Sequence, residues 1–213
     1  MSIQKNSVFV LAILLLTLAA VPITATAQLL PSPYSQDEEA DDPEADERAD
    51  ASLFQRADAI DFSDGTLVKG AATLVRKVQN DQGSVHLSVT MSELDTNASY
   101  SAWFIIFNTP CAGGPGNCTE PELEGVTNAG GFVTGDDGTG YFTSVLDEGP
   151  LSTGIDGFGA GLADSIASEI HVVLQSHGDS VAGSVAGQIS IFEFACTPEC
   201  EDQFAFIFPP GSP

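Results

Sequence analysis

Short runs of strand-forming residues, each ended by Gly, Asn, Asp or Pro, fill the chain from about residue 66 onward. Residues 85–91 alternate strictly between apolar and polar side chains, which is the period of a half-buried strand. Residues 100–107 are apolar on both faces, as in a strand covered from both sides. No helical pattern of ten or more residues separates these runs, and only residues 155–168 offer room for a crossover helix. A parallel sheet, which needs such helices, is therefore disfavoured.

The other runs of this type complete a set of about eight strands. They are residues 67–78, 132–134, 141–143, 169–175, 188–194 and 203–208. Asp136-Asp137-Gly138 supplies a tight turn, so we expect 132–134 and 141–143 to pair as a hairpin. Many short strands at close spacing predict an all-β domain over residues 65–213, built as an antiparallel β-sandwich or a flattened barrel.

The first 27 residues have the pattern of a secretory signal peptide. Lys5 supplies the positive region, residues 8–21 form an apolar run of 14 residues, and Ala25-Thr26-Ala27 is a small-x-small cleavage site. The apolar run is shorter than the roughly 20 residues that span a bilayer. We therefore expect cleavage after Ala27, no membrane span afterwards, and a protein that is secreted, extracellular or periplasmic.

An acidic leader over residues 28–64 is expected to precede the domain. Residues 37–50 hold nine acidic side chains and one basic one, Arg48, and almost nothing apolar, so we expect a disordered linker. Within the leader, Leu53, Ala57 and Ile60 stand at helical spacing, which predicts one short helix over 51–62.

The formal net charge of −24 excludes several classes of partner. Nucleic acids and anionic membrane surfaces are bound through clustered Lys and Arg, and this chain has six against 30 acidic residues. The acids lie in the domain as well as in the leader. Two alternatives explain this distribution of acidic residues: adaptation to a salty medium, or a dedicated acidic binding face.

The four cysteines stand in two close pairs. In an exported protein an even number of cysteines indicates disulfides, and the local pairing is Cys111–Cys118 with Cys196–Cys200, although spacing leaves the cross pairings open. The alternative is a four-cysteine zinc site. The second pair has the spacing of such a site, whereas six residues separate the first pair.

The three histidines are the candidate metal ligands. If the strands 85–91 and 169–175 were neighbours, His86 and His171 would face each other, and with His177 and a carboxylate such as Glu169 they could hold Cu²⁺ or Zn²⁺. The alternative is that these histidines pack and form hydrogen bonds between strands. As candidate ligand-binding residues we single out Trp103, Glu169, His171 and His177, because aromatic and titratable groups at strand ends commonly bind ligands.

Catalytic motifs are absent from the sequence. Gly183-Ser184-Val185-Ala186-Gly187 places its Ser one position early for a nucleophile elbow, so a small hydrolase is only a third hypothesis. No EF-hand pattern occurs, which leaves loose surface Ca²⁺ binding as the remaining calcium option. No cofactor is predicted.

Three segments resemble a group of uncharacterised secreted bacterial proteins. They are Tyr100 to Cys111 with its Asn-x-Pro ending, Ser168-Glu169-Ile170-His171 followed by Ser176-His177-Gly178, and the final aromatic strand from Gln203 to Phe206. The resemblance covers about residues 66–208, and a fainter similarity to secreted CHRD-type β-domains lies in the His-containing strand. It implies export and an all-β domain. Our leading hypothesis is therefore a secreted or cell-envelope module that binds an extracellular or cell-surface ligand, or has a structural role, without catalysis.

Overall fold

The computed structural model describes residues 28–29, 48–151 and 158–211, so the predicted signal peptide and most of the acidic leader lie outside the described residues. The strands are β1 (Gln28–Leu29), β2 (Ala51–Asp61), β3 (Leu67–Gln79), β4 (Gln82–Met91), β5 (Ala98–Phe107), β6 (Gly125–Val133), β7 (Gly140–Asp147), β8 (Glu169–Asp179) and β9 (Glu201–Phe208). Two short helical turns, η1 (Glu120–Glu122) and α1 (Val185–Gln188), interrupt the connections.

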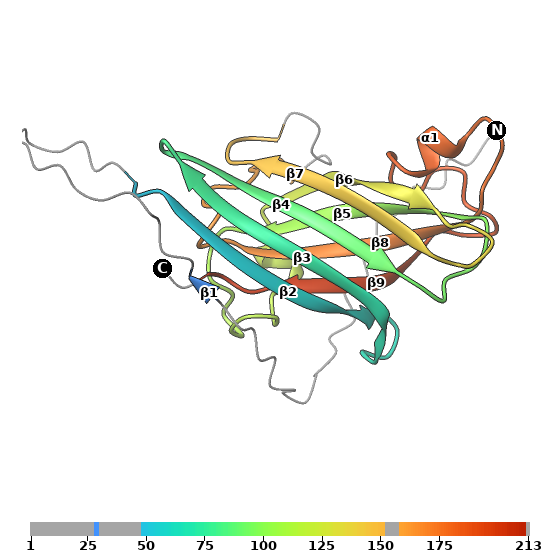
Figure 1. Ribbon diagram of the computed structural model, residues 1–213, viewed down its shortest axis with the longest axis horizontal. Coiled ribbons are helices and arrows are strands. Elements are labelled where there is room, and N and C mark those ends of the chain that lie inside the picture. The colour runs from blue at the N-terminus through green and yellow to red at the C-terminus, as the bar shows by residue number, and fades with distance from the viewer. Residues whose placement is uncertain (1–27, 30–47, 152–157, 212–213) are drawn as a thin grey trace, which may run out of the picture.

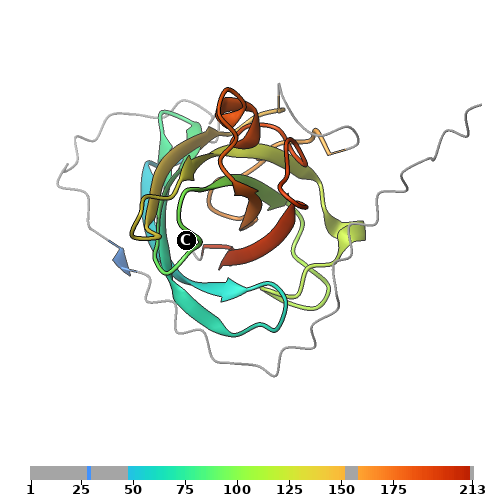
Figure 2. The same cartoon turned by 90° about the vertical axis from the view of Figure 1, so that its right-hand side faces the viewer.

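One antiparallel sheet curls into a nearly closed barrel. Its strands follow the order β6-β5-β8-β9-β2-β3-β4-β7, with β1 paired to the outer edge of β2. Figure 1 shows the barrel from the side, and Figure 2, turned by 90°, shows the ring of strands around its interior. The predicted all-β fold is confirmed, in its flattened-barrel form.

The barrel closes between β6 and β7 through aromatic rings. The Tyr100, Phe132 and Phe142 rings stack in sequence, with centroids 5.3 Å and 6.0 Å apart. A Cβ atom on Gly140 would lie 2.0 Å from the Phe132 ring, so this position needs glycine. The predicted hairpin between 132–134 and 141–143 is wrong in its pairing: the turn exists, but β6 forms its ladder with β5 and β7 forms its ladder with β4.

The inward-facing side chains form the main core. Along β4 the predicted alternation is confirmed, because Val85, Leu87, Val89 and Met91 are all buried. Along β5 the inner set includes Phe104 and Ile106, both at most 1% exposed. Burial of such side chains is the main favourable contribution to the stability of a domain of this size.

Arg76 closes one end of this core although it carries a charge. Its side chain is 0% exposed, and all five of its N–H groups donate hydrogen bonds. The acceptors are the Gln55 side chain and the backbone carbonyls of Ser165, Ser168, Phe208 and Pro209. Burial lowers the pKa of Arg76 to about 10, and the arginine ties β2, β3, the chain before β8 and the end of β9 together.

A second core covers the outer face of β5. Trp103 and Phe107 pack there against Leu123, Val126 and Cys111, with Phe158 and Phe192 at the margin. Phe158 comes from the connection between β7 and β8, and the rest of the cover comes from two connections, residues 108–124 and residues 180–200. Each contains one disulfide, Cys111–Cys118 in the first and Cys196–Cys200 in the second, so the predicted local pairing is confirmed. These coverings explain why residues 100–107 are apolar on both faces.

The predicted helix over 51–62 is wrong, because these residues form β2. Its buried positions alternate as Leu53, Gln55, Ala57 and Ala59, and the polar Gln55 conceals that alternation in the sequence. The folded part also begins earlier than residue 65. Arg48 donates hydrogen bonds to Glu148 at 2.8 Å and to Asp164 at 2.6 Å, which ties the end of the leader to the barrel.

The predicted strand over 188–194 is also wrong. The short helix α1 ends at Gln188, and turns follow it. Gln188 is 0% exposed, and its side-chain amide donates to the carbonyls of Asp179 and Ala195 while its oxygen accepts from the Val181 N–H. These bonds fold the segment back on itself, so it does not enter the sheet, and its Phe192 packs on Trp103 of β5.

Candidate functional site

The three histidines do not form one metal site. That hypothesis required neighbouring strands, but β4, which carries His86, pairs with β3 and β7, whereas β8, which carries His171 and His177, pairs with β5 and β9. Within the described residues, no cluster of three closely spaced metal-type ligands contains His86 or His171. His86 instead lies 3.2 Å from the Ser84 hydroxyl on the outer surface.

Glu169 and His171 share the outer face of β8, as the sequence indicates. The His171 ring nitrogen Nε2 lies 2.6 Å from Glu169 Oε1, which also accepts a hydrogen bond of 2.7 Å from the Gly116 N–H. His171 packs on the Phe107 ring at 5.0 Å. The second oxygen of Glu169, Oε2, is buried without a hydrogen-bond partner. This pair holds the 108–124 connection against the barrel.

Trp103 and His177 meet through Ser101 at the other end of β8. The Trp103 indole donates to the Ser101 hydroxyl at 2.9 Å, and this hydroxyl lies 2.8 Å from His177 Nε2. On its other side His177 Nδ1 lies 2.8 Å from the Phe194 carbonyl, an acceptor only. Nδ1 therefore carries the proton and Nε2 accepts from Ser101. Burial lowers the pKa of His177, so the ring is held neutral.

Solvent does not reach most of these predicted ligand-binding side chains. Trp103 is 4% exposed, Glu169 is 1% and His177 is 0%, because the two disulfide-containing connections lie over them. The Ser101–His177 contact has the atoms of a nucleophile and base. However, Ser101 is also 0% exposed, so no substrate reaches it in this conformation.

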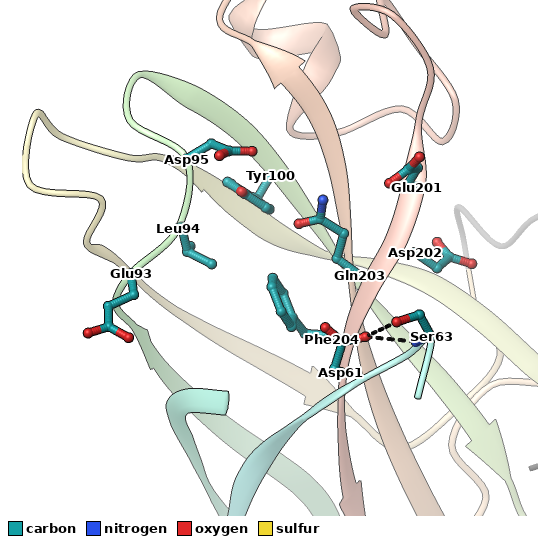
Figure 3. Close-up of a pocket in the computed structure, with 10 residues that line it drawn as sticks. All are labelled: Asp61, Ser63, Glu93, Leu94, Asp95, Tyr100, Glu201, Asp202, Gln203 and Phe204. Atoms are coloured by element: carbon teal, nitrogen blue, oxygen red, sulfur yellow. Dashed lines mark hydrogen bonds between the residues drawn. The ribbon is translucent and has the colours of Figure 1, made fainter. Parts of the chain in front are cut away.

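An acidic cavity opens at one end of the barrel, at the end that carries α1 (Figure 3). Its volume is about 310 Å³. Five carboxylates line it, together with Ser63, Leu94, Tyr100, Gln203 and Phe204, and the acids are Asp61, Glu93, Asp95, Glu201 and Asp202. We call this hollow the acidic mouth. In Figure 3, Tyr100, Gln203 and Phe204 lie between the acids of the β4–β5 connection and those of β2 and β9.

The acidic mouth concentrates negative charge around a partly apolar floor. Burial raises the pKa of Asp202, and the nearby charge of Glu193 raises it further, against a hydrogen bond from Gln175. Burial and the charge of Asp95 raise the pKa of Tyr100. Glu93 is paired with Lys69, whereas Asp61 caps the turn at Ser63 with bonds of 2.5 Å and 2.8 Å. The site suits a cation with some apolar surface.

None of these acids belongs to a motif that the sequence makes visible. The usable signal is their position: Glu93 and Asp95 follow one strand, and Glu201 and Asp202 begin another. Antiparallel connectivity brings the end of one strand beside the start of the next, so acids at alternating strand ends gather at one mouth. Which strands are neighbours, however, cannot be obtained from spacing.

Comparison with protein-family models, with curated proteins and with solved structures finds no match to this chain. In the parts of the chain that the structure describes, no helix has both the length and the apolar character to cross a membrane.

Proposed function

We propose that this protein is an exported, non-catalytic binding module that takes a small organic cation in the acidic mouth of its barrel. Export is supported by the signal-type N-terminus and by the two disulfides, which persist in oxidising compartments. A binding role without catalysis is supported by the burial of Ser101 and His177, one of the two Ser–His pairs in hydrogen-bond contact among the described residues. The other pair, Ser84 with His86, lies on the outer face of β4.

One observation carries the proposed ligand class. Five carboxylates surround a floor that includes Tyr100 and Phe204, in a hollow within the size range of small-molecule sites. An aromatic face attracts cations, and Phe204 is the partly exposed ring, because Tyr100 is only 1% exposed. Carboxylates add charge and accept hydrogen bonds from N–H groups. Lys69 neutralises Glu93 alone, so an excess of negative charge remains for a ligand.

The test is calorimetric titration of the oxidised protein with spermidine, with Ca²⁺ as a second probe. We expect spermidine to bind at one site and more weakly as salt is added. Replacing Asp95 by Asn together with Glu201 by Gln removes two charges from the mouth and should weaken binding roughly tenfold, from the Coulomb energy of exposed pairs.

The matched control removes two charges elsewhere. Asp58→Asn with Asp147→Asn changes exposed acids that do not line the mouth, and it should leave the affinity within a factor of two. Equal weakening by both double variants would show a general charge effect and contradict the proposed site. Absence of any binding at low salt would leave a structural role as the better interpretation, and tighter binding of Ca²⁺ would replace the organic cation by a metal ion.

A further inference from the structure

The fold brings His177 next to the Cys196–Cys200 pair. A ring nitrogen of His177 and the two sulfurs all lie within 4.8 Å of one another, and Nδ1 is 3.3 Å from the Cys200 sulfur. The histidine comes from β8, and the cysteines come from the connection that leads into β9. The sequence analysis considered His177 and this cysteine pair as parts of two different metal sites, and the structure joins them in one place.

We propose that this group, once its disulfide is reduced, is a binding site for one Zn²⁺ ion, so that the disulfide and the metal are alternative states of the same three side chains. Zinc takes thiolate sulfur at about 2.3 Å and imidazole nitrogen at about 2.0 Å, which separates tetrahedral ligand atoms by roughly 3.3–3.8 Å. The observed separation of Nδ1 and the Cys200 sulfur, 3.3 Å, lies in that range. Three residues separate the cysteines, as in C-x₂₋₄-C zinc sites.

Reduction of the Cys196–Cys200 disulfide needs two electrons, which a phosphine can supply. The phosphine gives two electrons to the S–S bond and takes an oxygen atom from water to become a phosphine oxide, while the two sulfurs become thiols. Zinc binding then releases both thiol protons to solvent, because the metal ligand is the thiolate. The two thiolates neutralise the charge of the ion. The chain supplies three ligands, so the fourth coordination position is left to water, which enters from the exposed side of the loop.

One hydrogen-bond partner of His177, the Ser101 hydroxyl, supports a ligand role, whereas the Phe194 carbonyl would lose the bond that it accepts from Nδ1. For the metal to bind Nδ1, the ring proton moves from Nδ1 to Nε2, with no change in ring charge. Nε2–H then donates to the Ser101 hydroxyl, which has two lone pairs and already accepts one bond from Trp103. Fixing the second ring nitrogen in this way orients metal-binding histidines.

The surroundings also favour a cation. Glu193, Glu199 and Glu201 are exposed acids in the same stretch of chain. The other cysteine pair has a carboxylate and no histidine beside it: Glu169, whose Oε1 accepts from Gly116 and contacts His171 and whose Oε2 has no partner. It also lacks the zinc-site spacing. It is nevertheless a possible competitor, so the test removes it.

The experiment uses the full chain with Cys111→Ser and Cys118→Ser, reduced by a phosphine without oxygen and titrated with Co²⁺ and then Zn²⁺. We expect one Co²⁺ per chain, an intense sulfur-to-cobalt charge-transfer band, displacement by one equivalent of Zn²⁺, and release of about two protons per zinc ion. Adding His177→Asn, which keeps a donor toward the Phe194 carbonyl, should weaken the affinity at least tenfold.

Several controls make the result decisive. The oxidised chain and a Cys196→Ser/Cys200→Ser variant should not give the charge-transfer band, and His171→Asn should leave the affinity unchanged. Near-ultraviolet circular dichroism checks that each variant is folded. If the Cys111/Cys118 variant is unfolded, the reduced wild-type chain is titrated, and His177→Asn should remove one equivalent of metal. A folded, reduced chain without bound Co²⁺, or with an affinity that His177→Asn does not change, overturns the proposal.

Discussion

At the scale of single residues, buried polar groups determine how this chain folds around its core. Arg76 has an acceptor for each of its five N–H groups. Gln188 uses its amide to hold together the connection over β5. His177 is kept neutral between Ser101 and the Phe194 carbonyl. Such groups cost free energy when a partner is lost, so each of them specifies one arrangement of the chain.

His177 should make the stability of the oxidised protein depend on pH. Its pKa is lowered in the folded state by burial, so below about pH 6.5 the unfolded chain binds a proton that the folded chain does not. The free energy of unfolding should therefore be highest above that pH and fall as the pH drops toward the folded-state pKa, by at most about 1.4 kcal/mol per pH unit.

Denaturant unfolding between pH 7.5 and 5.5 measures this contribution. The His177→Asn variant should be less stable at pH 7.5, and its stability should vary less over the same range. Parallel curves for the two proteins would mean that the folded state does not hold this ring neutral.

At the scale of strands and loops, the barrel is closed by side chains at one seam. Hydrogen-bonded ladders join each successive pair of strands in the order from β6 to β7, whereas β6 and β7 meet through stacked rings. Gly140 makes that contact possible, because it leaves space for Phe132.

Gly140→Ala should therefore destabilise the barrel by about 1–3 kcal/mol, the usual cost of overpacking. The matched control is Gly159→Ala, because a Cβ atom there would meet no atom within 4 Å. Thermal or denaturant unfolding compares the two. Equal stability of the two variants would show that the Phe132 ring moves aside at little cost.

The sequence predicts strands correctly where burial alone sets the alternation of apolar and polar residues. It misleads where buried polar contacts interrupt that alternation. Val85 to Met91 alternate cleanly and form β4 as predicted. The sequence predicts a helix where β2 forms, because Gln55, a partner of Arg76, interrupts the apolar positions of this strand. The part of β6 before Phe132, with Gly125, Asn128 and Gly130, resembles a loop in composition. The acidic mouth could not be predicted, since it depends on which strand ends are neighbours.

At the scale of the whole molecule, the excess of acid should oppose folding at low ionic strength. The chain carries a formal charge of −24, and compact states bring like charges closer together. Raising the salt from 0.1 M to 1 M shortens the screening length from about 10 Å to about 3 Å. The melting temperature should rise by about 5 °C or more over this range.

Differential scanning calorimetry in NaCl, KCl and CsCl tests this expectation. Screening is indifferent to the identity of the cation, so the three salts should give similar rises. A rise in one salt alone would indicate a bound ion, and a melting temperature that does not change would show that repulsion has little effect on stability.

The two disulfide-stapled connections lie over the same side of the barrel, above β5, β6 and β8. Outside these strands, Phe54 on β2 and Tyr141 and Val145 on β7 remain between 46% and 62% exposed. The two connections thus cover one side of the barrel and leave the remaining strands uncovered. Among the described residues, a partner that binds to the side of the barrel would therefore contact the sheet itself, with its alternating side chains, only on the uncovered strands.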